Sequence, residues 1–279
     1  MHVWNIYAEI FVKKFILGNL FTLAAADGRL FRTKELGSGE RMQTEIGNQQ
    51  FLEYLDRLGG GLEGLKAWEK TVKNSIDIPV GASCIVFNAN PFTNGHRYLA
   101  EIASKRSSLV LVLVIQGKTE SGGKGNHEDT GLEFPFKDRL RLVEQGLQDL
   151  GNVAVLPSGP FIVSRDDYPQ GYLSDILGAA PAHAKLDGMV FCHVLGALGI
   201  GNAFAGDEPR DELSEIHLNA LRQECRTAGI TLRVAERKRL GDRYISSSMV
   251  RDALSKGRKE EVAQIVPPHV LEYLGPFFS

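Results

Sequence analysis

The sequence predicts an α/β protein built on a doubly wound parallel sheet, with a shorter N-terminal region of different character. Two observations carry this prediction. Short runs that are continuously apolar and rich in β-branched residues, such as SCIVF (83–87) and LVLVLVI (109–115), are typical of strands buried on both faces. Amphipathic stretches separate these runs, and such alternation of strands and helices implies a parallel sheet covered by helices.

Five strands are expected, at 83–87, 109–115, 152–156, 202–206 and 231–235. Between them, apolar residues at helical spacing predict three helices, marked by Leu99, Ile102 and Ala103, by Leu140, Val143, Leu147 and Leu150, and by Leu213, Ile216, Ala220 and Leu221. For the run MVFCHVLGALGI (189–200), periodicity alone leaves helix and strand open. The glycine-rich segment Gly117–Gly131 is expected to be a mobile loop.

The expected organisation is an N-terminal region over 1–80 and a larger domain over 81–279. The first region is polar in places, and the Gly-Gly-Gly at 59–61 is expected to break regular structure. Its stretch Lys13–Gly28 resembles a secretion signal, but Gly18 and Asn19 interrupt the apolar run, which is also too short to span a bilayer. We therefore predict a cytoplasmic protein.

The composition narrows the classes of partner. The 279 residues are 43% hydrophobic and 24% charged, as in a globular protein with a sizeable core, and the formal net charge is -2. That balance gives no overall attraction to nucleic acid or to an acidic membrane, so any anion site must be local. Three cysteines without paired spacing argue against a disulfide framework or a zinc site and fit a reducing compartment.

The first candidate site follows the first predicted strand, in NANPFTNGHRYLAE (88–101). Ligands of doubly wound sheets bind where strands end and helices begin, and a helix N-terminus attracts anions. Gly95 permits close approach of the backbone, and Thr93 and His96 can donate hydrogen bonds to phosphate. The alternative is that Thr93 only caps the helix and that His96 is a surface residue.

The second candidate site is YISSSMVRDAL (244–254). Ser246, Ser247 and Ser248 lie at a predicted helix start, and Arg251 follows one turn later. Hydroxyl and N–H groups there again suit phosphate, and the arginine adds a positive fork. A serine-rich cap with a solvated arginine is the alternative, but the coincidence of both motifs in one α/β domain favours a polyphosphate site.

These motifs resemble those of the HIGH-motif nucleotidyltransferase superfamily, in which they hold the triphosphate of ATP. The chain is most similar to the citrate lyase ligases, also called acetate:citrate lyase ligases. The resemblance covers roughly Ser83 to Leu274 and rests on IVFNANPFTNGHRYLAE, FPFKDRLRLVEQG, FIVSRDDYP, LGALGI followed by FAGDEP, YISSSMVR and IVPPHVLEYL. It implies a Rossmann-like nucleotidyltransferase domain.

The resemblance also implies the chemistry. Acetate and ATP form an acyl-adenylate, and the acetyl group passes to the phosphopantetheine-type prosthetic group on the acyl-carrier subunit of citrate lyase. Mg2+ is expected to bridge the phosphates, with no protein side chain assigned as its ligand. His96, Thr93 and Lys118 are implied as catalytic residues, and Lys124 is an alternative to Lys118. The residues implied in nucleotide binding are Asn88, Asn90, Gly95, Gly206, Asp207, Glu208, Ile245, Ser246, Ser247, Ser248 and Arg251.

Three questions stay open at this point. Citrate lyase ligases usually carry an acetyltransferase-like domain before this one, whereas only about 80 residues precede Gly81 here, so the N-terminal region is interpreted as a shortened domain. A phosphopantetheine adenylyltransferase shares both motifs, and a non-catalytic nucleotide-binding protein is a further alternative. Asp138 and Arg139 are interpreted as charges at a helix start rather than as site residues.

Overall fold

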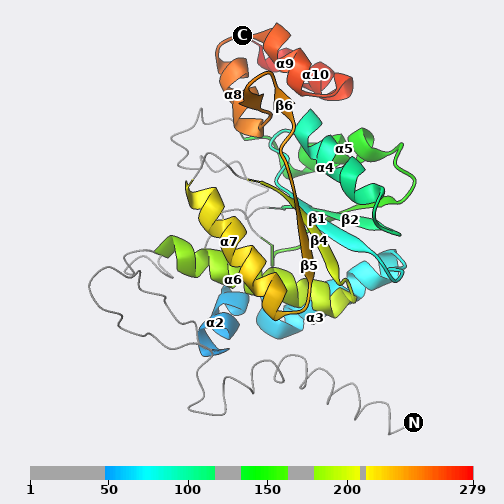
Figure 1. The fold of residues 1–279 in the computed structure, drawn as a ribbon, viewed down its shortest axis with the longest axis vertical. Helices are drawn as coiled ribbons and strands as arrows, with labels where there is room; N and C mark the ends of the chain where they lie inside the picture. The colour runs from blue at the N-terminus through cyan, green and yellow to red at the C-terminus, as the bar shows by residue number, and fades with distance from the viewer. Residues whose placement is uncertain (1–47, 117–132, 163–178, 208–211, 279) are drawn as a thin grey trace, which may run out of the picture.

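The computed structural model describes residues 48–116, 133–162, 179–207 and 212–278. Its centre is a five-stranded sheet in the order β3-β2-β1-β4-β5, and every pair of neighbours is parallel (Figure 1). The strands are β1 (Ser83–Phe87), β2 (Val110–Val114), β3 (Val153–Pro157), β4 (Asn202–Gly206) and β5 (Thr231–Ala235). The predicted fold class is confirmed, with each strand within one residue of its expected bounds.

The order of the strands places a switch point beside β1. From β1 the chain moves outward to β2 and β3 on one side, and β4 and β5 then fill the other side. Sheets of this kind bind ligands beside such a switch point, at the carboxyl ends of the strands.

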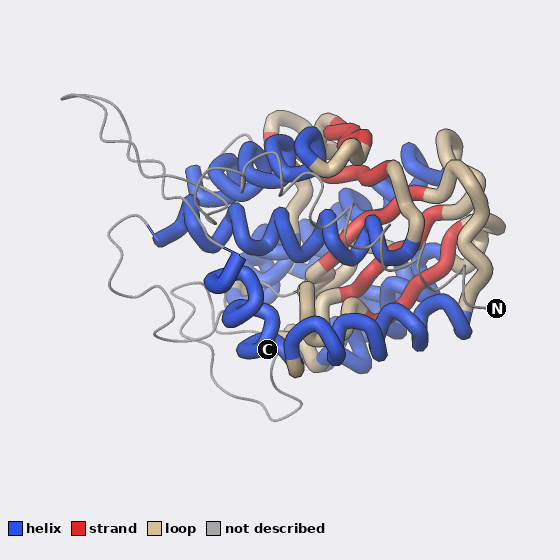
Figure 2. The backbone as a smooth tube through the Cα atoms, turned by 90° about the horizontal axis from the view of Figure 1, so that it is seen from below, coloured by secondary structure: helices blue, strands red, loops and turns tan. Residues whose placement is uncertain are grey.

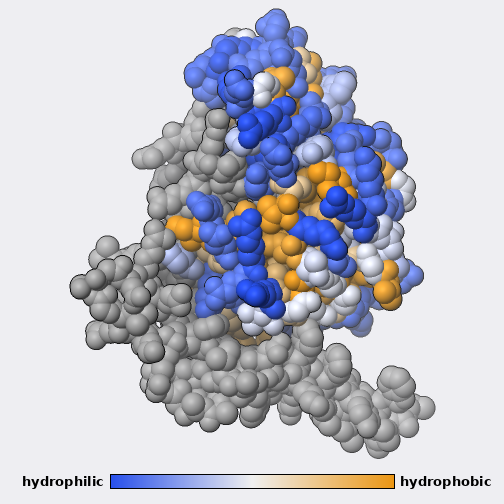
Figure 3. All heavy atoms as spheres, viewed as in Figure 1, coloured by the Kyte–Doolittle hydropathy of each residue, from blue (hydrophilic) through white to orange (hydrophobic). Residues whose placement is uncertain are grey.

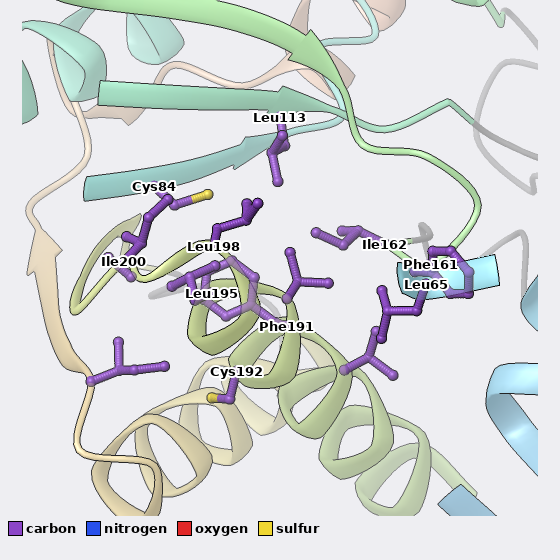
Figure 4. Packing of buried hydrophobic residues seen from close by; sticks show 14 of the residues in the cluster. Leu65, Cys84, Leu113, Phe161, Ile162, Phe191, Cys192, Leu195, Leu198 and Ile200 are labelled. Atoms are coloured by element: carbon purple, nitrogen blue, oxygen red, sulfur yellow. The ribbon is translucent and has the colours of Figure 1, made fainter. Parts of the chain in front are cut away.

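Helices cover both faces of the sheet (Figures 1 and 2). Strand side chains alternate between faces, so Leu111 and Leu113 of β2 join one core cluster while Val110, Val112 and Val114 join another. The first cluster lies against α6 (Ala179–Leu198), as Figure 4 shows for Cys84, Leu113 and Leu195. The other described helices that follow β1 in the chain are α4 (Asn94–Ser104), α5 (Phe136–Leu147), α7 (Glu212–Thr227), α8 (Ser247–Ser255), α9 (Lys259–Ile265) and α10 (Pro268–Leu274), and the 3-10 turn η2 (Gly275–Phe277) comes last.

The run at 189–200, which the sequence left open between helix and strand, is helical as far as Leu198. The short antiparallel pair β6 (Arg239–Leu240) and β7 (Arg243–Tyr244) leads from β5 into α8. In the view of Figure 3, hydrophilic residues gather over this C-terminal part of the molecule. Over the residues that the structure describes, no helix combines the length and the apolar character needed to cross a membrane.

Two helices before β1 pack onto the sheet as well. They are α2 (Asn48–Gly59) and α3 (Gly61–Ser75), and Gly60 between them has a left-handed backbone with φ 90°, as the glycine run suggested. Tyr54 and Leu65 are fully or almost fully buried in the first core cluster. The Tyr54 hydroxyl donates to Asp187 Oδ1 on α6 at 2.8 Å, so α2 is fixed to the main body by polar as well as apolar contacts.

A substitution at Gly159 tests the packing of α3 against the loop that follows β3. A Cβ at this position would lie 2.5 Å from Trp68 Cδ1 on α3, and the glycine φ is +67°. We expect Gly159→Ala to reduce the free energy of unfolding by about 2 kcal/mol, because left-handed backbone and overpacking each cost roughly 1 kcal/mol or more. Urea denaturation measures this change. Gly151→Ala, where nothing lies within 4 Å of the new Cβ, is the control; equal losses in the two variants would contradict the packing argument.

Candidate functional site

The two predicted motifs lie together at the carboxyl edge of the sheet. The loop after β1, residues 88–93, leads into α4, and the N-terminus of α8 lies directly against that loop. The Ser247 hydroxyl donates to the carbonyl oxygen of Pro91 at 2.9 Å. Arg251 Nη1 donates to the carbonyl oxygen of Asn90 at 2.7 Å. Segments about 160 residues apart in the sequence are therefore joined by two hydrogen bonds.

Thr93 and His96 form a capping box at the start of α4. Thr93 is the N-cap, and its Oγ1 accepts from the backbone N–H of His96 at 3.4 Å. The backbone N–H of Thr93 donates in return to His96 Nδ1 at 3.0 Å, and the Thr93 hydroxyl lies 2.9 Å from the same nitrogen. Because Nδ1 accepts a hydrogen bond, the proton of the neutral ring must be on Nε2. Thr93 is almost fully buried, so the structure places its side chain at the cap.

The surroundings of His96 keep its ring neutral. The ring meets Phe87 edge-on at 4.8 Å between centroids and stacks on Phe92 at 5.6 Å. Burial, with a smaller contribution from the positive charge of Arg237, lowers the pKa of His96 from 6.5 to about 3. A neutral imidazole with its proton on Nε2 is a hydrogen-bond donor near neutral pH. Its low pKa makes it unsuited to proton transfer there.

The three serines of the second motif differ in their contacts. Ser246 is the N-cap of α8, with its Oγ accepting from the backbone N–H of Met249 at 3.2 Å. Its hydroxyl also lies 3.0 Å from that of Ser248, which is exposed. Ser247 holds the loop after β1, as described above. The exposed hydroxyl and the first N–H groups of α8 are thus the groups of this motif that can bind an anion.

Gly95 allows the starts of α4 and α8 to approach each other. A Cβ on Gly95 would lie 3.3 Å from the carbonyl oxygen of the buried residue Ile245 and 3.4 Å from Thr93 Oγ1. Two helix N-termini therefore meet at one place, and each contributes unpaired N–H groups and a positive dipole end. An anion near both of them is favoured by both dipoles.

Gly95→Ala tests this approach. We expect it to lower turnover about 10-fold, because the starts of α4 and α8 must separate by a few tenths of an ångström and small misplacements in a site cost rate. Stability should change little, since alanine favours the helix while the crowding opposes it. Steady-state kinetics and urea denaturation measure the two effects. Gly201→Ala, at the opposite edge of the sheet and in open space, is the control, and full activity in Gly95→Ala would contradict the argument.

Asn88 and Asn90 differ in how they are held. The side chain of Asn90 is buried, and its Oδ1 accepts from the backbone N–H of Phe134 at 2.9 Å. Asn88 is exposed at the end of β1, and both its carbonyl oxygen and its Oδ1 accept from Arg139 Nη1, at 2.6 and 3.0 Å. Arg139 does lie in the first turn of α5, as expected. Its side chain is buried against the site loop, which the sequence analysis missed.

The ends of β4 and β5 complete this edge. Gly206 ends β4, and the next residue, Asp207, donates its backbone N–H to the carbonyl oxygen of Ala235 at 2.9 Å. Asp207 Oδ1 accepts from the backbone N–H of Arg237 at 2.8 Å. This bond ties Arg237 to the loop after β4, and the charge of Arg237 acts on His96. Sequence reasoning missed Arg237, although the basic run ERKR (236–239) was a signal.

Some expected residues lie outside the described ranges, namely Lys118, Lys124 and Glu208 and the loop that carries the two lysines. Across the described ranges, no group of three or more His, Cys, Asp or Glu side chains could hold a metal ion. The groups assembled at this edge are mostly donors and cations, which could bind an anion. They are the helix N-termini, the Nε2–H of His96, the Ser248 hydroxyl and nearby arginines.

A family model of known proteins matches the part of the chain that contains the sheet and both motifs. Residues 82–274 match the family model of the citrate lyase ligase C-terminal domain. The chain belongs to the citrate lyase ligase family. The matched range begins just before β1 and ends with α10, so the sheet and both motifs lie within the citrate lyase ligase domain.

Individual relatives agree with this family. A citrate (pro-3S)-lyase ligase from Escherichia coli (strain K12) is 32% identical over 197 residues, which are 68% of this chain and 53% of that protein. The Haemophilus influenzae protein of the same name is 31% identical over 196 residues, 68% of this chain and 55% of that protein. The chain spans about half the length of the curated relatives it matches.

Among solved structures, a pantoate-beta-alanine ligase from Francisella tularensis, complexed with beta-gamma ATP and beta-alanine, resembles this chain with a TM-score of 0.45 and 15% identity. The match covers 71% of this chain and 74% of that one. A similarity of this size carries no information about ligands, and the fold assignment rests on the strand order of the chain itself.

Proposed function

We propose that this protein uses ATP to activate acetate and transfers the acetyl group to the prosthetic-group thiol on the acyl-carrier subunit of citrate lyase, releasing AMP and pyrophosphate. The observation that carries the proposal is the meeting of the α4 and α8 N-termini beside the Nε2–H of His96. Family membership favours the ligase reaction over other uses of such a site.

The proposed reaction has two steps. An acetate oxygen attacks the α-phosphorus of ATP, the bond to the β-phosphate oxygen breaks, and pyrophosphate leaves with the electron pair. The carrier thiol then loses its proton to solvent and attacks the acetyl carbonyl carbon, and AMP leaves. Negative charge builds up on the phosphates in the first step, so fixed donors that are already in place lower its barrier.

The described residues have roles that fit this scheme. His96 would donate through Nε2 to a phosphate oxygen without changing its own protonation state. Ser248 and the N–H groups of α8 would hold the leaving pyrophosphate, with positive charge from Arg251 and Arg237. Asn88 would contact the α-phosphate region, and Gly206 and Asp207 would line the nucleotide pocket. Lys118 and Glu208 stay candidates from the sequence alone.

Mg2+ is proposed as the cation that accompanies ATP. It would reach the site with the phosphates of ATP and keep several of its waters, so no protein side chain is assigned to hold it. When bound, it would compensate phosphate charge. The side chains of this edge, being mostly donors and cations, fit phosphates rather than the metal itself.

A two-arm assay tests the proposal. The protein is incubated with ATP and Mg2+, adding acetate and deacetylated citrate lyase carrier in one arm and 4'-phosphopantetheine in the other. AMP formation that depends on both acetate and carrier supports the ligase. Dephospho-CoA formation in the second arm instead identifies an adenylyltransferase, and absence of turnover in both arms leaves a nucleotide-binding protein as the function.

A further inference from the structure

Arg139 is a buried cation directly beneath the candidate site, outside both sequence motifs. Only 3% of the residue is exposed. Three of its hydrogen bonds are to the segments that frame the site: Nε donates to the carbonyl oxygen of Phe134 at 3.0 Å, and Nη1 donates to both oxygens of Asn88. Its guanidinium thus links the first turn of α5 to the end of β1.

The contact with Asn88 determines how that side chain is turned. A guanidinium has only donors, so an amide that bonds to it must present its oxygen. Asn88 Oδ1 lies 3.0 Å from Arg139 Nη1, and the Nδ2 group is therefore directed away from the arginine. Asn88 is exposed at the carboxyl end of β1, where a ligand would bind. Without the arginine, the Asn88 amide could turn over and direct its oxygen, in place of its Nδ2 group, towards the ligand.

The backbone beside Asn88 needs such support. Ala89 has φ 50°, a left-handed conformation that costs an alanine roughly 1–2 kcal/mol. The loop is held against this cost from several sides: by Arg139 at Asn88, by the Phe134 N–H at the Asn90 side chain, and by Arg251 at the Asn90 carbonyl. Of these, the contact from Arg139 alone also reaches a side chain that faces the ligand site.

We propose that Arg139 is a positioning residue that orients the Asn88 amide so that its Nδ2 group donates to a phosphate oxygen of the bound nucleotide. The inference rests on the proposed function in one respect, namely that the ligand is a nucleoside triphosphate. It adds a role for α5, and it makes the orientation of Asn88, as well as its identity, a determinant of binding.

Two substitutions separate orientation from donation. Arg139→Lys keeps the charge, but a single ammonium cannot take the places of both Nε, which donates to the Phe134 carbonyl, and Nη1, which donates to Asn88. The loop should therefore loosen and the amide should no longer be fixed. Asn88→Asp keeps oxygens facing Arg139 but replaces the outward NH2 group with a second oxygen. The loop should therefore stay ordered in Asn88→Asp, while binding of a phosphate is lost through repulsion.

The measurements are amide hydrogen exchange over residues 88–93 and the affinity for a non-hydrolysable ATP analogue with Mg2+. We expect exchange in Arg139→Lys to be at least ~10-fold faster in this loop, with the amides of β1 and β2 protected as in the original protein. Analogue affinity should fall about 10-fold in Arg139→Lys and at least as much in Asn88→Asp, where exchange stays unchanged. The control is Arg141→Gln, an exposed arginine on the same helix that pairs with Asp138.

A purely structural Arg139 would give a different result. Arg139→Lys would then have a lower melting temperature but an unchanged KM for ATP in the folded enzyme, and Asn88→Asp would bind the analogue normally. The inference is overturned by an unchanged KM for ATP in Arg139→Lys, by normal analogue binding in Asn88→Asp, or by unchanged loop exchange in Arg139→Lys. Failure of the proposed function is seen separately, as absence of acetate-dependent AMP formation in the unsubstituted protein, and the affinities of the two variants for the ATP analogue then still test the inference.

Discussion

Replacing His96 with alanine is expected to lower acetate- and carrier-dependent AMP formation by at least ~100-fold, the effect of removing one fixed donor from a developing charge. The capping box and the neutral ring leave Nε2–H as the donor that faces away from the helix start. The binding of ATP should weaken less than turnover falls, because the donor gains most when charge accumulates on the phosphate. Single-turnover and steady-state kinetics separate the two.

His96→Gln is the matched control for folding. Alanine also removes the bond to the Thr93 N–H, which costs about 1 kcal/mol of stability. Glutamine at this position can accept from the same N–H, as in other capping boxes, but offers no ring donor at the position of Nε2. We expect His96→Gln to unfold at nearly the original urea concentration and to stay as slow as the alanine variant. Recovery of activity in His96→Gln would mean that His96 only caps the helix.

The low pKa of His96 gives the same prediction a pH dependence. The pH profile of turnover should show no ionisation of His96 near pH 6.5, since burial lowers the pKa of the folded ring to about 3. The folded protein takes up this proton less readily than the unfolded chain does. The contribution of the buried neutral His96 ring to the free energy of unfolding is therefore complete above pH 6.5 and declines as the pH falls towards 3. Over that window, the original protein should lose more stability than His96→Gln; equal slopes would contradict the assigned burial of the ring.

Most of the sheet could be predicted from the sequence because its strands are buried on both faces. Continuous apolar runs such as 109–115 have few other stable environments in a protein of this composition. The same physics made 189–200 ambiguous. The helix α6 packs against the sheet cluster and against α2, α3 and α7, so Leu186, Val190 and Val194 are buried along with residues on its other sides. A helix that is apolar all round has no periodic signal to detect.

The sequence predicted that both motifs begin helices, but it did not predict the hydrogen bonds that join the two motifs. Thr93, His96 and Ser246 lie at helix starts, where local spacing is informative. The contacts of Ser247, Arg251 and Arg139 end on backbone carbonyl oxygens of residues 88–91, and every residue type has a carbonyl oxygen. A sequence therefore carries no mark of such a partner. The role of Arg237 depends likewise on the pairing of β4 with β5, which only the fold reveals.

Arg251→Ala is expected to lower turnover by ~100- to 1,000-fold, because it removes a cation beside the proposed phosphate site and a bond to the loop that carries Asn88. The comparison is with Ser247→Ala, which loses only a neutral hydrogen bond to the adjacent carbonyl of Pro91. That bond contributes about 1 kcal/mol, so the expected loss is about 10-fold or less. Kinetics at saturating ATP and at low ATP separate loss of rate from loss of binding.

Arg233→Ala controls for the removal of an arginine as such. Arg233 lies on β5 and donates to Asn202 at the opposite edge of the sheet, at 2.9 Å, so its loss should leave turnover near normal. Arg251→Lys then divides the two contributions of Arg251. If the positive charge dominates, lysine restores most of the rate; if the geometry of the bond to Asn90 dominates, it restores little, because one ammonium cannot hold the carbonyl and reach the phosphate together. Normal turnover in Arg251→Ala would show that the two motifs do not act as one clamp.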